Sequence, residues 1–184
     1  MKKLIVTLAL GMACVSAFAQ GTLIFGNANA QVNAPIWQDA ITTGTKLAGT
    51  AWIAQLWYGP AGSVESALVA NPTTATFSTT AAQAGYFFGG ARTIDTIPAG
   101  SVAVLQVRVW NAAAGATWAA ALANPTAYTG VSGLINATLT VPPATPVNMV
   151  GLGSFAVVQN VPEPSSFALA GLGAAALLIF RRRK

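Results

Sequence analysis

Apolar and polar residues alternate with a period of two along several segments, which is the pattern of strands with one buried face. The clearest segment is 102–110. Its opposite face includes the polar residues Gln106 and Arg108, so a half-buried strand is expected there. The residues that share its apolar face are Ala103, Leu105, Val107 and Val109.

Other segments extend this pattern into a fold prediction. Residues 131–141 alternate in the same way, and the aromatic segment 52–58 is predicted to be a central strand. About eight short strands separated by turn residues predict an all-β fold, an antiparallel β-sandwich, for the domain at residues 20–160. The further strands are expected at 22–26, 75–80, 86–88, 92–97 and 149–158.

Proline-containing turn signals divide these strands. The pairs Asn71-Pro72 and Asn124-Pro125 are predicted to lie in turns. Two Ala-rich segments, 64–70 and 117–123, are predicted to form at most short helices, each stopped by the Asn-Pro pair that follows it.

The N-terminal segment 1–19 has the parts of a secretory signal peptide. Two lysines precede an apolar stretch at 4–15, and the small residues Ala17 and Ala19 form the cleavage pattern. Signal peptidase is therefore expected to cut before Gln20, and the segment that follows is expected to cross the inner membrane.

Two other interpretations of this end stay open. One is an uncleaved membrane anchor. The other is a lipoprotein modified at Cys14, although Gly11, three residues earlier, is not the large aliphatic residue that such a site favours.

Near the C-terminus, an apolar segment lies between a proline-rich motif and four cations. As a helix, residues 166–180 would span roughly 22 Å, which is short for a bilayer core of about 30 Å, although long basic side chains can reach the interface. The segment is predicted to be a short transmembrane helix with its basic end in the cytoplasm. The alternative is a helix packed on the domain. The basic membrane stop is Arg181, Arg182, Arg183 and Lys184.

This C-terminal arrangement resembles a known sorting signal. Pro162 and Pro164 cannot donate backbone hydrogen bonds and favour extended chain, and Glu163 lies between them. The Pro-Glu-Pro motif, apolar segment and basic cluster of residues 161–184 resemble the PEP-CTERM signal of Gram-negative bacteria. The resemblance implies recognition by exosortase, a membrane-embedded cysteine transpeptidase-like enzyme, and a link with exopolysaccharide and biofilms.

A looser resemblance covers parts of the domain. Segments 20–25, 55–60 and 107–110 are similar to exported proteins of Verrucomicrobia-type bacteria that carry the same kind of tail. Those proteins have no assigned activity, so this resemblance supports the class and adds no function.

The formal charge of +5 arises at the two ends of the chain. Between residues 20 and 160 three acidic and three basic residues balance, so the domain lacks the basic patch that nucleic-acid binding requires. The chain has no His, and its one Cys is in the predicted signal peptide. This inventory disfavours an enzyme and predicts no metal and no cofactor. The charged residues of the domain are Asp39, Lys46, Glu65, Arg92, Asp95 and Arg108.

Aromatic residues are the remaining candidates for ligand binding. Trp52 and Trp110 lie in predicted strands and are expected in the core. Trp37 and Trp118 lie in less regular sequence and are predicted to be more exposed, where their rings could stack on sugars.

The preferred functional hypothesis is an exported, membrane-anchored and then sorted protein of the cell surface or extracellular matrix. Its role would be structural or adhesive, and not enzymatic. A carbohydrate-binding module that uses exposed tryptophans is the alternative. A hydrolase or a calcium site built on Asp39, Glu65 and Asp95 is less favoured, because these carboxylates are widely separated in the sequence.

Overall fold

The computed structural model describes residues 20–160. The predicted signal peptide, sorting motif, transmembrane segment and basic tail lie outside these residues. The longer strands are β1 (Gln20–Gly26), β6 (Trp52–Pro60), β7 (Val69–Thr76), β8 (Phe88–Pro98), β9 (Val102–Asn111), β10 (Tyr128–Val131), β11 (Ile135–Thr138) and β13 (Ala156–Gln159). The two-residue strands are β2 (Ala28–Asn29), β3 (Val32–Asn33), β4 (Trp37–Gln38), β5 (Thr45–Lys46) and β12 (Val147–Asn148). The helical segments are η1 (Glu65–Ala67), η2 (Ala81–Gln83), η3 (Ala112–Ala114) and α2 (Trp118–Ala123).

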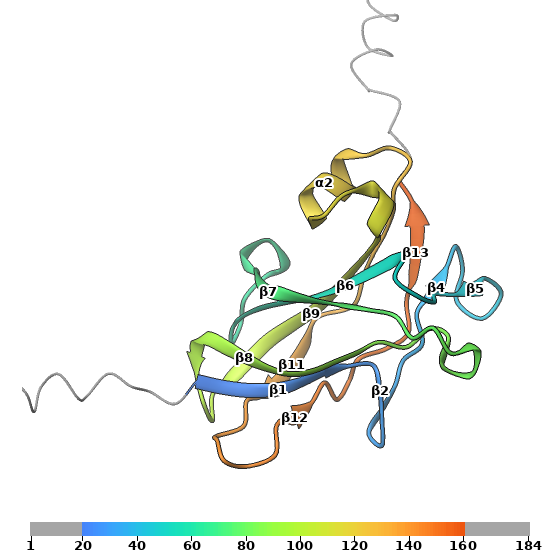
Figure 1. Ribbon diagram of the computed structural model, residues 1–184. Helices are drawn as coiled ribbons and strands as arrows, with labels where there is room; N and C mark the ends of the chain where they lie inside the picture. The colour runs from blue at the N-terminus through green and yellow to red at the C-terminus, as the bar shows by residue number, and fades with distance from the viewer. Residues whose placement is uncertain (1–19, 161–184) are drawn as a thin grey trace, which may run out of the picture.

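Apart from β2 and β3, which pair only with each other, the strands form a small sheet and a large sheet that face each other across the core (Figure 1). The small sheet has the order β12-β1-β8, and the large sheet runs β5-β4-β13-β10-β9-β6-β7 with β11 also paired to β9. Most pairs are antiparallel, but β1 with β12 and β13 with β4 are parallel. The predicted all-β, largely antiparallel fold is confirmed. The described residues contain more strands than expected because five of them are only two residues long.

The main core lies between the inner faces of the two sheets. Phe25 of β1 contacts Phe87 with 4.7 Å between ring centroids, and both side chains are fully buried. The alternation predicted for 102–110 is confirmed, since one face of β9 enters this core. Its inward residues are Ala103, Leu105, Val107 and Val109.

The prediction that this strand is half-buried is wrong, because the outer face of β9 is also covered. Gln106, Arg108 and Trp110 are also buried, because the chain after β9 folds back and places α2 over this face. Trp118 at the start of α2 packs against Trp110, with 6.0 Å between ring centroids. A second hydrophobic cluster therefore lies outside the sheet, made by Trp110, Trp118, Ala121 and Ala127.

Arg108 joins this outer cluster to the rest of the sheet. Its guanidinium carbon lies 3.8 Å from the ring centroid of Trp57 and 5.5 Å from that of Trp118. Its Nε donates to Gln106 Oε1 at 2.9 Å, and Nη2 donates to the Glu65 carbonyl at 3.3 Å. Desolvation lowers the pKa of Arg108, and the Glu65 carboxylate, 3.8 Å away, acts in the opposite direction. The guanidinium stays charged, because the ordinary pKa of Arg is far above neutral.

Two predicted boundaries are wrong near Asn71 and Pro72. The pair lies inside β7 instead of in a turn. The short helix predicted within 64–70 is present as η1, but it ends at Ala67, so the Asn-Pro pair does not stop it. Proline is tolerated here because β7 is an edge strand, where one side of the backbone needs no ladder partner. The pairing of β6 with β7 shifts register at this point, and the side chain of Gln55 donates to the Asn71 carbonyl at 2.9 Å.

The predicted strand at 131–141 is divided into the end of β10 and β11. Ser132 lies between them, and its hydroxyl accepts a hydrogen bond from Val107 N at 2.9 Å. The backbone N–H of Ser132 donates to Val107 O at the same distance. The side chain thus replaces a backbone partner, and the chain leaves β9 and pairs with it again from Ile135.

Truncating a fully buried residue of β9 should be much more costly than truncating an exposed one on the same strand. Leu105→Ala is expected to destabilise the mature protein by about 2–5 kcal/mol, because it removes core contacts and leaves a cavity. Val102→Ala, at a position that is 39% exposed, should cost less than about 1 kcal/mol. Urea unfolding followed by tryptophan fluorescence measures both, and equal costs would contradict the burial described here.

Stacking and hydrogen bonding at Arg108 should stabilise the fold more than its ion pair does. Arg108→Lys loses the planar contact with Trp57 and the Nε hydrogen bond, and is expected to cost about 1–3 kcal/mol. Glu65→Gln should cost less than about 1 kcal/mol, because the Glu65 side chain is 55% exposed. The same unfolding measurement compares them. A larger loss in Glu65→Gln would show that the ion pair dominates.

Candidate functional site

The strongest candidate site lies where the edges of the two sheets meet. Strand β7 ends the large sheet and β8 ends the small one. Side chains join the two edges: Arg92 Nη2 donates to the Thr74 carbonyl at 3.3 Å, and Asn71 Nδ2 donates to the Thr93 carbonyl at 3.3 Å. We call this junction of β7 and β8 the seam.

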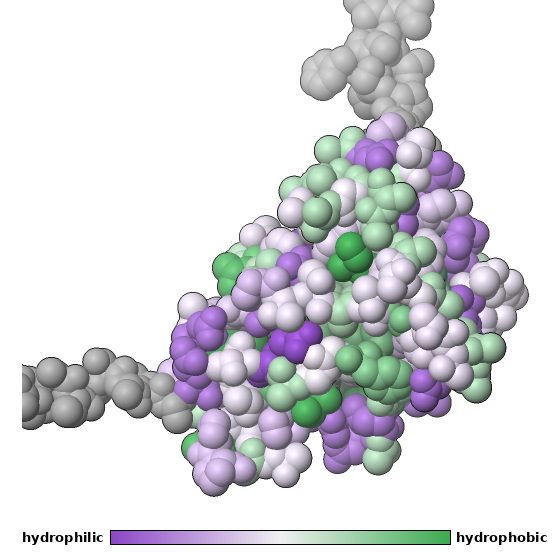
Figure 2. Space-filling view, in the orientation of Figure 1, coloured by the Kyte–Doolittle hydropathy of each residue, from purple (hydrophilic) through white to green (hydrophobic). Residues whose placement is uncertain are grey.

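A recess of about 260 Å³ opens to solvent along the seam. Figure 2 shows a strongly hydrophilic area of surface in the region of β7 and β8. One guanidinium, one carboxylate, one amide and two threonine side chains contribute to its walls. Such a set offers both donors and acceptors with no net charge, which suits a neutral, hydroxyl-rich ligand better than an anion. The lining residues are Asn71, Pro72, Thr73, Ala91, Arg92, Thr93 and Asp95.

Arg92 occupies an unusual position for a charged residue. It pairs with Leu23 in the β1–β8 ladder, and its guanidinium carbon lies 5.6 Å from the ring centroid of Phe25 at the edge of the core. Burial lowers its pKa. Nε is buried and has no hydrogen-bond partner within residues 20–160, so part of this guanidinium's hydrogen-bonding capacity is unused.

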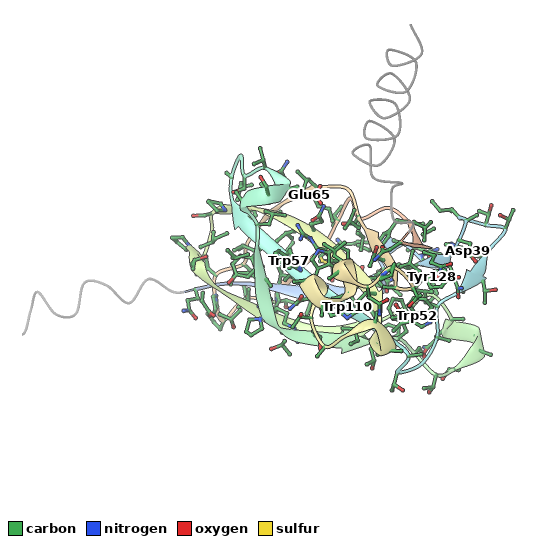
Figure 3. The ribbon with its side chains drawn as sticks, turned by 90° about the horizontal axis from the view of Figure 1, so that it is seen from above. Asp39, Trp52, Trp57, Glu65, Trp110 and Tyr128 are labelled. Carbon is green, nitrogen blue, oxygen red and sulfur yellow. The ribbon has the colours of Figure 1, made fainter. Side chains whose placement is uncertain are left out.

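The four tryptophans considered above do not all lie where the sequence predicts. Trp110 is fully buried, as expected, in the outer hydrophobic cluster. Trp52 is partly buried and meets Tyr128 edge-on, with 6.1 Å between centroids (Figure 3). The expected exposure of Trp118 is wrong: its side chain is only 8% exposed, because it covers Trp110. Trp37 is partly exposed, and the Lys46 ammonium lies 5.1 Å from its ring centroid.

The three carboxylates of the domain lie on three different elements. Asp39 follows β4, Glu65 is in η1 and Asp95 is in β8. Figure 3 shows Asp39 and Glu65 well apart from each other. Among residues 20–160, no three His, Cys, Asp or Glu residues lie close enough together to hold a metal ion.

Sequence reasoning missed the seam, although it noticed two of its residues. Arg92 and Asp95, two of the charged residues considered in the sequence, both line the recess, and Ile94 between them is buried in the core. The alternation also puts Arg92 on the same face as Ile94, which was a sign of an inward-facing cation. Nothing in the sequence indicated that Asn71 and Thr74 would contact β8, because they meet this strand only when the two sheets pack together.

None of the helices in the described part of the chain has the length and apolar character needed to cross a bilayer. The transmembrane segment predicted at 166–180 lies outside that part.

Comparison with known proteins gives information about the C-terminal segment only. No curated protein and no solved structure matches the chain. The family model for the PEP-CTERM protein-sorting motif matches residues 160–184. This segment contains the Pro162-Glu163-Pro164 motif and the basic cluster on which the resemblance rested. Residues 160–184 therefore carry a PEP-CTERM sorting motif, which indicates an exported protein that exosortase processes and that is sorted at the membrane toward the cell surface.

Proposed function

We propose that residues 20–160 form a non-enzymatic structural or adhesive domain that acts at the outer cell surface or in an extracellular polysaccharide matrix. In this proposal, signal peptidase releases the N-terminus before Gln20. The C-terminal segment then holds the precursor in the membrane until exosortase acts on it.

The observation that carries the proposal is the attachment of a surface-sorting motif to a domain with few acid–base groups. General acid–base catalysis needs a titratable side chain placed against the reacting group. Here His is missing from the sequence, and Asp39, Glu65 and Asp95 come from separate elements. A hydrolase that uses two cooperating carboxylates needs them within about 10 Å of each other, and nothing in the arrangement of the three favours such a pair.

The buried interactions of the domain also support a structural role. The buried polar residues Gln106 and Arg108 bond to each other and to neighbouring backbone carbonyls in a network that fixes η1 to the sheet. Buried, satisfied polar groups of this kind favour a single well-defined packing. A domain that bears adhesive contacts benefits from such rigidity.

A carbohydrate-binding module is the second candidate, and two observations favour it. Trp37 is the partly exposed member of the predicted stacking pair, with Lys46 beside its ring. The seam provides a polar recess with donors and acceptors suited to hydroxyl groups. The two features lie on different strands, β4 and β7/β8, so they can be tested separately.

Glycan binding distinguishes the two candidates. The mature protein is incubated with exopolysaccharide purified from the producing bacterium, and binding is followed by calorimetry. Under the module hypothesis, Trp37→Ala should weaken binding at least about fivefold, since loss of a stacked ring removes about 1–3 kcal/mol. Phe88→Ala is the matched control, because Phe88 is 55% exposed and lies on β8. Asp95→Asn tests the seam in the same assay.

Each outcome of this assay favours one hypothesis. Saturable binding that Trp37→Ala or Asp95→Asn abolishes would support the module. Binding that no single substitution changes, or no saturable binding at all, would favour the structural role. Hydrolysis of the polysaccharide by the wild-type protein would contradict both.

Processing should remove both ends of the chain. Intact-mass measurement of the protein released from the native cell surface is expected to give Gln20, in open or cyclised form, as the first residue. The cluster Arg181, Arg182, Arg183 and Lys184 should be missing from this form. A surface form that keeps these four residues would contradict the proposed C-terminal processing, and one that begins at Met1 would contradict the signal peptide.

A further inference from the structure

The last described residue, Asn160, is held in place by its backbone N–H and by both polar atoms of its side chain. Its backbone N–H donates to the Ala127 carbonyl at 2.7 Å. Its side-chain Nδ2 donates to the carbonyls of Ala121 and Asn124, both at 3.0 Å. Its Oδ1 accepts a hydrogen bond from Thr129 Oγ1 at 2.6 Å. We call this set of contacts the Asn160 clamp.

The Asn160 clamp provides hydrogen bonds to the C-terminal end of α2. The last carbonyls of a helix have no partners within it, so they need side chains, turns or water. The amide of Asn160 reaches two carbonyls from this end of α2 and its following turn. Strand β13 ends one residue earlier, at Gln159, so the side chain of Asn160 connects the end of this strand to α2. Figure 1 shows the end of β13 beside α2.

The clamp also connects the chain end to the outer hydrophobic cluster. Helix α2 carries Trp118, which covers Trp110 and lies beside Arg108. Thr129, the partner of Oδ1, is buried in β10 and pairs with Trp110 in the β9–β10 ladder. Loss of the contacts at residue 160 would therefore release both the end of β13 and the C-terminal end of α2, the helix that covers the outer face of β9.

The sorting segment begins directly at this clamp, and the family match itself starts at residue 160. We propose that Asn160 is a positioning residue for sorting. It fixes the end of the folded domain against α2, so that the chain is protected from cleavage up to Asn160 and processing is confined to the residues that follow. This inference depends on the PEP-CTERM motif and is independent of the adhesive role proposed above.

Asn160→Asp tests the clamp with a change of almost no volume. A carboxylate cannot donate to the carbonyls of Ala121 and Asn124, and its negative charge lies at the helix end that already carries partial negative charge. The full chain is expressed in a host that contains exosortase, and the C-terminal residue of the processed form is read by intact mass. Asn148→Asp is the matched control, because the Asn148 side chain donates only to exposed Gln31.

Wild type and Asn148→Asp should each give a processed form that ends at or beyond residue 160. Asn160→Asp should add shorter forms that end within 121–159. Limited proteolysis of the purified processed proteins should cut this region of the variant at least about tenfold faster, since each lost hydrogen bond contributes about 1 kcal/mol and cleavage follows the population of the opened state.

Two results would overturn the proposal. One is a single unchanged terminus with an unchanged proteolysis rate. The other is a lower amount of protein with the terminus unchanged, which would leave Asn160 with a role in stability alone. If the Asn160→Asp protein does not accumulate, Thr129→Val provides the deciding test. This substitution removes only the hydroxyl that is bonded to Asn160 Oδ1 and keeps the shape of the side chain. It should produce the same shorter forms in smaller amounts, and their complete absence would overturn the proposal.

Discussion

Strand β9 is hydrogen-bonded along both edges and covered on both faces, and the rest of the domain is arranged around it. Strand β6 pairs with it from Trp52 to Pro60. Its other edge is shared between β10 and β11, with Ser132 bridging the change of partner. Because an unpaired buried polar group costs about 1–3 kcal/mol, the surrounding chain has to satisfy the two polar side chains that the outer face of this strand buries, Gln106 and Arg108.

This requirement explains the position of η1 and α2. The Glu65 carbonyl in η1 accepts from Arg108, and Trp118 at the start of α2 packs over the same region of the sheet. Trp57 places its ring against the guanidinium. The outer layer is thus partly polar and partly aromatic, unlike the apolar core between the sheets. The packing of this outer layer depends on α2 remaining against the sheet, and Asn160, the last residue of the described chain, contributes hydrogen bonds that hold it there.

The seam and the outer layer are two solutions to the same physical problem. At the seam, two sheet edges meet without a backbone ladder joining them within residues 20–160, and the side chains of Arg92 and Asn71 bridge the edges. Because side chains, and not a backbone ladder, join the two edges, a recess remains between them. Polar groups that hold a fold together can therefore also create the surface on which a ligand is bound.

The linear features of this chain could be read directly from its sequence. The Pro162-Glu163-Pro164 motif, the basic cluster and the neutral charge balance of the domain depend on residue order and composition alone. The alternation along β9 and the aromatic pattern of β6 were also predictable, because a period of two states which side chains share a face of a strand.

Tertiary structure decided what covers each face and which distant residues meet. The same period of two does not say whether a second layer covers the polar face of β9, so Trp118 was expected to be exposed and is buried. The turn expected at Asn71-Pro72 became part of an edge strand once β6 supplied a side-chain partner through Gln55. Arg108 with Glu65, Arg92 with Thr74, and Thr129 with Asn160 meet across long stretches of chain. These pairs form only when sheet packing brings the segments together, because local sequence patterns carry no information about contacts between segments that far apart.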